Sequence, residues 1–277
     1  TVATIPVEKE SVPGFGIMQM NDSNEITRFE EKPQDPSLQE ELKLPKDWYP
    51  KLDIHSDKEL WLASMGIYVF NRQTILELLD NAHTDFGKHI IPGAIKTHKL
   101  SSYVFQGYWE DVGTIKAFFD ANLDLTSMLP KFNFFDMDSP VFTRPRFLPA
   151  SKVNGGVIEN SLLSDGCIVH KARLKECMLG IRSIVGADTD MQRVVMMGAD
   201  YYESLQSIAK HQEEGEPSVG IGPRTRVVNA IIDKNARIGS DCVISPDGKP
   251  NEMDSELFHV RDGIIVIPKN TVIPNGT

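Results

Sequence analysis

The stretch Ala230-Ile-Ile-Asp-Lys-Asn-Ala-Arg-Ile-Gly-Ser-Asp-Cys-Val-Ile244 carries isoleucine at every sixth position. A six-residue apolar period fits neither an α-helix nor a simple alternating strand. It is typical of short parallel strands wound into three-sided coils, with one aliphatic side chain pointing inward per side. We therefore predict a solenoid from about residue 152 onward, rather than chance periodicity in a β-sandwich. The positions that carry the period are Leu162, Ile168 and Leu174, then Leu179, Val185, Met191 and Met197, then Ile232, Ile238 and Ile244, then Val266 and Val272.

One polar segment with helical character, residues 201–216, interrupts the repeat. We expect it to loop out of the coils as a short helix and to serve an interface. Upstream of the solenoid, residues 127–151 are rich in proline and lack a helical period, which predicts a connector between domains. The boundaries expected from these changes are a domain over residues 1–135 and a solenoid domain over residues 136–277.

The first half of the chain alternates apolar strand-like runs with helical patterns, which argues for an α/β sheet. The apolar run 60–70 fits a central strand buried on both faces. Residues 34–60 are polar and proline-bearing, and we expect a surface excursion that is partly helical near residues 38–42. The other expected strands are 1–7, 15–20, 25–31 and 101–106, and the expected helices begin near Thr74 and Asp85.

Composition excludes several classes of protein. The chain has 277 residues and a net charge of -10, which argues against a nucleic-acid partner because such proteins present a basic face. No run approaches the roughly 18 apolar residues of a membrane span. Three cysteines in no metal-like spacing are expected to be buried and reduced. Seven scattered histidines form no ligand cluster in the sequence, so a structural zinc site is not expected.

Residues suited to a sugar phosphate gather at the expected strand ends. Glu31 and Lys32 pair a carboxylate for sugar hydroxyls with an ammonium for a phosphate. Ser64 offers a hydroxyl, and Gly16 permits close approach of the backbone. Taken singly, each of these residues is more often structural or solvated than functional.

The stretch Gly107-Tyr-Trp-Glu-Asp-Val-Gly-Thr114 adds an acid to this set. Thr114 can cap a helix that follows, whose apolar residues fall on one face. We expect Asp111 to be held at a strand-to-helix junction, where open α/β sheets place ligand-contacting groups. A carboxylate there suits a hard divalent cation whose shell is completed by phosphate oxygens.

Several motifs occur in an order that resembles the ADP-glucose pyrophosphorylase (glucose-1-phosphate adenylyltransferase) family, over essentially the whole chain. The last two motifs resemble the plant and cyanobacterial branch. The motifs are Phe29-Glu-Glu-Lys-Pro33, Ala63-Ser-Met-Gly-Ile-Tyr-Val-Phe70, Asp85-Phe-Gly-Lys-His-Ile-Ile-Pro92, Tyr108-Trp-Glu-Asp-Val-Gly-Thr114, Met196-Met-Gly-Ala-Asp-Tyr-Tyr-Glu203 and Ala230-Ile-Ile-Asp-Lys-Asn-Ala-Arg-Ile-Gly239.

The resemblance implies an α/β fold, the C-terminal part of a Rossmann-like nucleotidyltransferase domain followed by a left-handed parallel β-helix. It implies the magnesium-dependent conversion of ATP and glucose 1-phosphate into ADP-glucose and pyrophosphate, as in glycogen or starch biosynthesis. Gly16, Glu31, Lys32 and Ser64 would bind glucose 1-phosphate, and Asp111 would be one of two metal-binding aspartates. The family is commonly tetrameric, with identical or different subunits, and works in the bacterial cytoplasm or the plastid stroma.

The sequence departs from the family at its beginning. The glycine-rich loop that cradles the nucleotide triphosphate and the second metal-binding aspartate have no counterpart here. We therefore expect the chain to be the later part of a longer polypeptide, with an incomplete ATP site and no ADP-glucose synthesis on its own.

The resemblance also implies control by phosphorylated metabolites, with Arg226 and Arg261 as candidate effector-binding cations. Three other functions stay open. They are a non-catalytic regulatory subunit of the same family, a sugar-phosphate nucleotidyltransferase that uses UTP or GTP, and a hexapeptide-repeat acyltransferase, for which His170 is the catalytic candidate in the coils.

Overall fold

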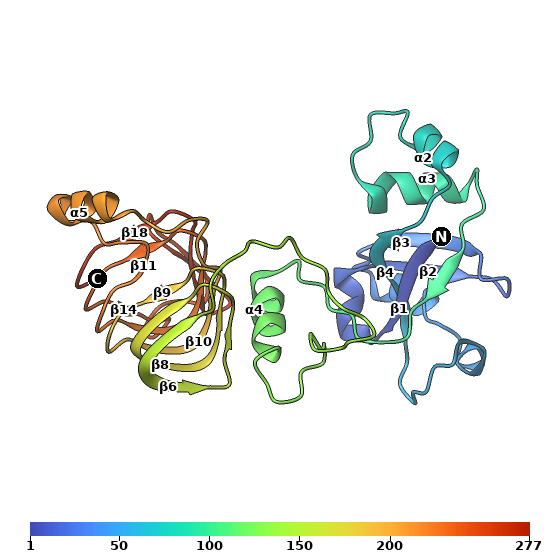
Figure 1. The fold of residues 1–277 in the computed structure, drawn as a ribbon. Coiled ribbons are helices and arrows are strands. Elements are labelled where there is room, and N and C mark those ends of the chain that lie inside the picture. The colour runs from blue at the N-terminus through green and yellow to red at the C-terminus, as the bar shows by residue number, and fades with distance from the viewer. The chain divides into compact units, whose positions relative to one another are not determined.

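The computed structural model describes residues 1–277 and divides into two compact units, Thr1–Gly107 and Tyr108–Thr277. Figure 1 shows the first unit as a small sheet with helices and the second as a stack of short strands. None of the helices combines the length and apolar character that crossing a bilayer requires.

The first unit is built on a five-stranded sheet with the strand order β3-β2-β4-β1-β5. The central position of β4 confirms the prediction for the apolar run, and β2 and β3 form the expected antiparallel hairpin. The sheet is mixed rather than parallel, because only the β1–β5 pair runs parallel. The strands are β1 (Val2–Val7), β2 (Gly16–Met20), β3 (Ile26–Glu31), β4 (Trp61–Tyr68) and β5 (Ser102–Val104).

Short helices connect these strands. Asp35 caps α1 by accepting from Ser37 N–H at 2.9 Å, and Asp85 caps η4 by accepting from Lys88 N–H at 2.9 Å. The apolar faces of η4 and α3 pack with β3 in one buried cluster around Phe29 and Ile91. The helices are η1 (Lys9–Gly14), α1 (Pro36–Glu41), η2 (Lys46–Trp48), η3 (Pro50–Leu52), α2 (Arg72–Leu78), η4 (Phe86–Ile90) and α3 (Ile91–Ile95).

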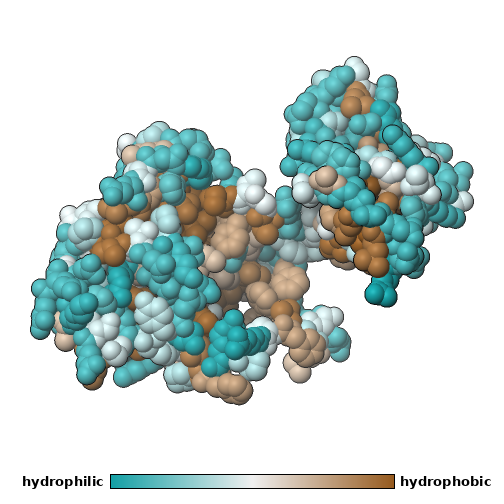
Figure 2. Space-filling view, turned by 90° about the horizontal axis from the view of Figure 1, so that it is seen from above, coloured by the Kyte–Doolittle hydropathy of each residue, from teal (hydrophilic) through white to brown (hydrophobic).

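Two expectations for this unit need correction. Residues 34–60 are more than a surface excursion, because Leu42, Leu44 and Tyr49 are buried against the sheet. The strand β4 is largely buried as far as Met65 but not beyond it, since Ile67 is 51% exposed. Figure 2 shows hydrophobic patches between hydrophilic residues on each unit. Whether an apolar run is buried therefore depends on the segments that pack against it in the fold. The sequence of the run does not specify those segments.

The second unit contains the predicted solenoid, a parallel β-helix. Paired residues of successive coils are 16 or 17 positions apart in the chain, or 35 or 36 apart where an insertion intervenes. Leu162 pairs with Met178, and Arg173 pairs with Asp190. The strands are β6 (Lys152–Glu159), β7 (Leu162–Leu163), β8 (Ile168–Leu179), β9 (Ile184–Val185), β10 (Asp190–Met196), β11 (Gly220–Ile221), β12 (Arg226–Ile232), β13 (Arg237–Ile238), β14 (Val243–Ile244), β15 (Met253–Asp254), β16 (His259–Arg261), β17 (Ile264–Ile267) and β18 (Val272–Ile273).

The inward positions confirm the aliphatic repeat but shift it by one residue in places. Val169 is fully buried whereas its neighbour Ile168 is 37% exposed. Likewise Met196 is 3% exposed and Met197 is 36% exposed. Within a block of coils, consecutive inward residues are either five or six positions apart, so a strict six-residue count drifts onto the outer face. The inward residues are Val169, Leu174, Leu179, Val185, Met191, Met196, Ile221, Val227, Ile232, Ile238, Ile244, Ile267 and Ile273.

The corners of the coils use left-handed backbone at equivalent positions. At one corner Asn160, Glu176, Arg193 and Asn229 have φ values of 44°, 53°, 53° and 47°. Asparagine adopts this conformation readily, whereas glutamate and arginine do so at a cost. The side chains compensate by pairing along the corner: Arg193 Nε donates to Asn229 Oδ1 at 3.0 Å and Nη1 lies 3.4 Å from Glu176 Oε2.

Helix α4 (Ile115–Asp124) packs on the outside of the coils. Phe119 is 1% exposed and lies in a cluster with Val195, Ile231 and Ile264, and the Arg193 guanidinium lies 5.6 Å from the centre of its ring. This packing places the boundary between the compact units after Gly107, upstream of the boundary at 135/136 inferred from composition. An apolar helical face does not reveal in the sequence which surface it covers.

Two segments interrupt the coils. The predicted looped-out helix is α5 (Leu205–Glu214), capped by Ser204, and Figure 1 shows it outside the stack of strands. The second interruption was not predicted: β15 and β16 form an antiparallel hairpin that continues into β17. Cys167, Cys177 and Cys242 are buried free thiols, as expected, and burial raises the pKa of Cys177 to about 11.

Candidate functional site

Three of the predicted substrate-binding residues lie in one row across the sheet of the first unit. Glu31 of β3 pairs with Gly16 of β2, and Ser64 of β4 pairs with Thr4 of β1. The antiparallel pairing of Ile17 with Ala63 places Gly16 opposite Ser64 in the next position. Residues directly opposite in neighbouring strands share a face of the sheet. The fold therefore brings Glu31, Gly16 and Ser64 together, although they are distant in the sequence.

The carboxylate of Glu31 lies between two glycines. A Cβ atom added to Gly16 would lie 2.8 Å from Glu31 Oε2 and would collide with the ring of Phe29. A Cβ atom added to Gly87, in η4, would lie 2.5 Å from the same oxygen. The absence of side chains at both positions thus creates the space that the carboxylate occupies. Sequence reasoning gave Gly87 no role, although it lies in a motif that carried the family resemblance.

Glu31 and Lys32 are polar groups without partners in the structure. The Glu31 side chain is half-buried and the Lys32 side chain is exposed, yet neither makes a hydrogen bond or an ion pair. The adjacent Glu30 differs, because it accepts from Arg28 Nε at 2.9 Å. Lys32 has a left-handed φ of 50°, and its N–H donates to Phe15 O at 3.0 Å, which fixes the chain as it leaves the sheet. A half-buried carboxylate beside an exposed ammonium, both with free bonding capacity, suits a polar, anionic ligand.

Two groups around this site are already engaged. The Ser64 hydroxyl accepts from Gly66 N–H at 3.3 Å, which leaves its own proton to donate. The Asp85 carboxylate accepts from the backbone of Lys88, and this hydrogen bond holds its pKa below the usual range. Asp85 therefore stabilises the start of η4, which carries Gly87.

Asp111 occupies a different position from the one predicted. The strand β5 ends at Val104, so Asp111 does not stand at the end of the sheet but in an exposed loop three residues before the helix cap. Thr114 caps α4 as expected, accepting from Ala117 N–H at 3.1 Å. The loop thus leads into a helix that packs on the coils. The Asp111 carboxylate makes no hydrogen bond or ion pair, and it belongs to the second unit.

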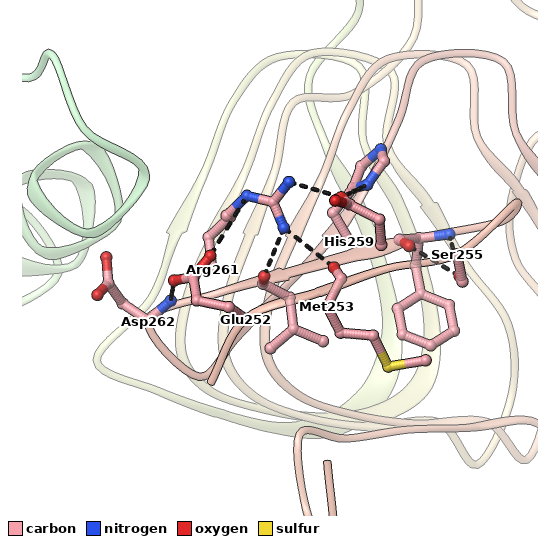
Figure 3. Close-up of polar contacts among 9 residues, drawn as sticks. Glu252, Met253, Ser255, His259, Arg261 and Asp262 are labelled. Atoms are coloured by element: carbon pink, nitrogen blue, oxygen red, sulfur yellow. Dashed lines mark hydrogen bonds and ion pairs between the residues drawn. The ribbon is translucent and has the colours of Figure 1, made fainter. Parts of the chain in front are cut away.

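Arg261 is engaged within the hairpin, which the sequence did not indicate (Figure 3). Its guanidinium donates to Asp254 Oδ1 at 2.5 Å and to the carbonyl oxygens of Val260 and Met253 at 2.8 and 3.0 Å. His259 Nδ1 lies 2.7 Å from the same Asp254 oxygen. Arg261 and then His259 hold the pKa of the Asp254 carboxyl below its ordinary value. An anionic effector at Arg261 would compete with this carboxylate.

Arg226, the other candidate for an effector, begins strand β12. Its side chain is exposed and makes no ion pair, and its strand neighbours are Asp190 and Val243. Of the two arginines, Arg226 is the one whose charge is available. His170, the candidate for an acyltransferase, is an exposed residue within β8 and makes no side-chain hydrogen bond.

Comparison with protein families gives two matches. Residues 1–128 match the nucleotidyl transferase family model, and residues 146–277 match the model of the GLGC left-handed parallel beta-helix domain. The chain thus combines a nucleotidyltransferase domain with a left-handed β-helix domain, which confirms the predicted fold class. The pair of domains supports a sugar-phosphate nucleotidyltransferase of the GLGC type and is consistent with the ADP-glucose pyrophosphorylase family.

Proposed function

We propose that this chain carries the sugar-phosphate site of a glucose-1-phosphate adenylyltransferase. The observation that carries the proposal is the unpartnered Glu31–Lys32 pair at the end of the row that includes Gly16 and Ser64. The Lys32 ammonium would bind the phosphate as a mobile point charge. Glu31 would accept hydrogen bonds from sugar hydroxyls, and Ser64 would donate one or accept one.

The reaction is adenylyl transfer. A phosphate oxygen of glucose 1-phosphate attacks the α-phosphorus of ATP, forming one P–O bond while the bond to the departing pyrophosphate breaks. Such transfers depend on positioning and charge neutralisation more than on covalent chemistry by the protein. Lys32 supplies part of that charge and fixes the attacking phosphate.

Asp111 would hold Mg²⁺ in this reaction. Its exposed carboxylate has no other partner, and carboxylate oxygens are the ligands that this hard cation prefers. The bound ion would neutralise charge on the triphosphate. Mg²⁺, ATP, the phosphorylated effectors and the tetrameric assembly all belong to this proposal, with Arg226 as the effector-binding cation that the structure leaves free.

Isothermal titration of the chain with glucose 1-phosphate tests the sugar-phosphate site. Lys32→Ala removes a charged partner of the phosphate, and charged hydrogen bonds contribute about 1.5–3 kcal/mol each. We therefore expect affinity to fall by roughly 10- to 150-fold. Glu31→Gln should weaken glucose 1-phosphate binding but leave the weak binding of inorganic phosphate unchanged.

Lys99→Ala is the matched control, because Lys99 is an exposed lysine of the same unit without an ion pair. It should bind glucose 1-phosphate as the parent chain does. Equal affinities of the parent, Lys32→Ala and Lys99→Ala chains would refute the assignment. Stronger binding of UDP-linked or GDP-linked sugars than of ADP-glucose would instead favour a nucleotidyltransferase that uses UTP or GTP.

A further inference from the structure

The insertion that contains α5 is anchored on the coils by a buried carboxylate. The side chain of Glu203 is 4% exposed, and its Oε2 accepts from Val219 N–H at 2.7 Å. Its Oε1 lies 2.7 Å from Arg237 Nη2 and 3.0 Å from His211 Nδ1. Neither contact has the angles of a hydrogen bond, so Oε1 is buried without a hydrogen-bond donor. Glu203 neutralises Arg237, and its Oε1 lies close to both the guanidinium and the His211 ring.

His211 belongs to a group of ligand atoms at the C-terminal end of α5. The side chains of His211, Glu214 and Glu216 offer ligand atoms that all lie within 4.8 Å of one another. The backbone creates this arrangement: Gly215 turns the chain with a φ of 74°, and Glu216 N–H donates to His211 O at 2.8 Å. Glu216 is thereby folded back beside the last turn of the helix.

The charges at this end of α5 are unfavourable in the absence of a cation. The C-terminus of a helix carries partial negative charge and favours cations. Here Glu213 and Glu214 end the helix and Glu216 follows it. Lys210 offers the only ion pair to these three carboxylates, at 3.6 Å from Glu214 Oε1. A bound cation would offset this accumulation of negative charge.

We propose that the C-terminal end of α5 binds a divalent transition-metal ion through His211, Glu214 and Glu216. One imidazole and two carboxylates form a mixed nitrogen and oxygen set that suits Zn²⁺ or Co²⁺ better than Mg²⁺. Glu203 is the carboxylate beside this ligand set: its Oε1 lies 3.0 Å from His211 Nδ1 and would orient the imidazole that binds the metal. Three protein ligands leave a position for water.

The sequence predicted no cluster of histidines, and the proposed site contains a single one, His211. His211 is distant from the other histidines in the sequence, and its partners in the proposed site are the carboxylates of Glu214 and Glu216. The site is independent of the sugar-phosphate site and of Mg²⁺. Its consequence is local: the metal would fix the end of α5 to the segment that follows it.

Titration of the chelator-treated chain with Zn²⁺, and separately with Co²⁺, tests the proposal. The parent chain should bind one equivalent, and the cobalt form should show visible d–d bands without a thiolate-to-cobalt band. His211→Gln and Glu216→Gln should each lower affinity by at least about tenfold, and Glu203→Gln by about 10- to 100-fold. Glu213→Gln is the matched control, since Glu213 lies on the same helix end outside the ligand group, and it should retain parental affinity.

Circular dichroism of each variant separates loss of the site from loss of folding. If Glu203→Gln unfolds the insertion, Glu216→Gln still decides, because Glu216 is exposed and lies outside the buried anchor. Identical Zn²⁺ isotherms for the parent and His211→Gln chains would overturn the proposal. A thiolate-to-cobalt band would also overturn it, because it would assign the metal to cysteine.

Discussion

Replacing Gly87 with alanine perturbs the candidate sugar-phosphate site by a single methyl group. The new Cβ would lie 2.5 Å from Glu31 Oε2 and 3.0 Å from its Cδ. Carbon and oxygen atoms that are not bonded to each other ordinarily lie about 3.5 Å apart. Because the φ of Gly87 is negative, alanine brings no left-handed strain at this position. The carboxylate of Glu31 therefore has to move by about 1 Å, away from both η4 and its place beside Gly16.

The expected loss follows from what Glu31 does for the ligand. A displaced carboxylate loses one charge-assisted hydrogen bond to a sugar hydroxyl, which is worth about 1.5–3 kcal/mol. Affinity for glucose 1-phosphate should consequently fall by roughly 10- to 150-fold. Isothermal titration measures the affinity, and chemical denaturation of the same variant measures how much of the effect is lost stability.

Gly93→Ala is the matched control. Gly93 lies in α3 of the same unit, and a Cβ atom there would meet nothing within 4 Å. This variant should bind as the parent does and be more stable by about 0.4–1 kcal/mol. Parental affinity in Gly87→Ala would refute the reasoning, because Glu31 would then either not contact the sugar or tolerate the shift.

Two further predictions concern the second unit. Phe119→Ala should destabilise this unit by about 3–5 kcal/mol, as for other buried phenylalanines. Phe132→Ala is the control and should change the stability little, because the Phe132 side chain is 42% exposed. Urea denaturation measures the stability of both variants, and equal stabilities would contradict the packing of α4 on the coils. In the hairpin, Asp254 has a lowered pKa because of Arg261 and His259, so its contribution to stability is present above the ordinary carboxyl pKa and is lost as pH falls through the folded value. Arg261→Gln should raise the Asp254 pKa toward its ordinary range in an NMR titration, and an unchanged titration would show that Arg261 does not hold this carboxylate.

Part of the candidate site could be predicted from local sequence, and part depends on contacts between distant segments. The candidate roles of Glu31 and Lys32 could be predicted because the two residues are adjacent and lie at the end of a strand with alternating apolar and polar residues. The roles of Gly87 and of the row through Ser64 depended on which strands and helices meet. Arg261 shows the opposite case: it was predicted to bind an effector, but its guanidinium pairs with Asp254 of the preceding strand.

The sequence alone determined the class of each half of this chain, because apolar periodicity is a local property that any packing must satisfy. The period of five or six residues between aliphatic side chains indicated the coils of a solenoid, and the alternation of apolar and polar residues over 25–31 indicated a strand. The tertiary structure decided which residue of each pair points inward, that α4 covers the coils, and that Gly87 and Gly16 flank Glu31. Those facts depend on contacts between segments far apart in the chain, and a one-dimensional pattern does not carry the distances that such contacts require.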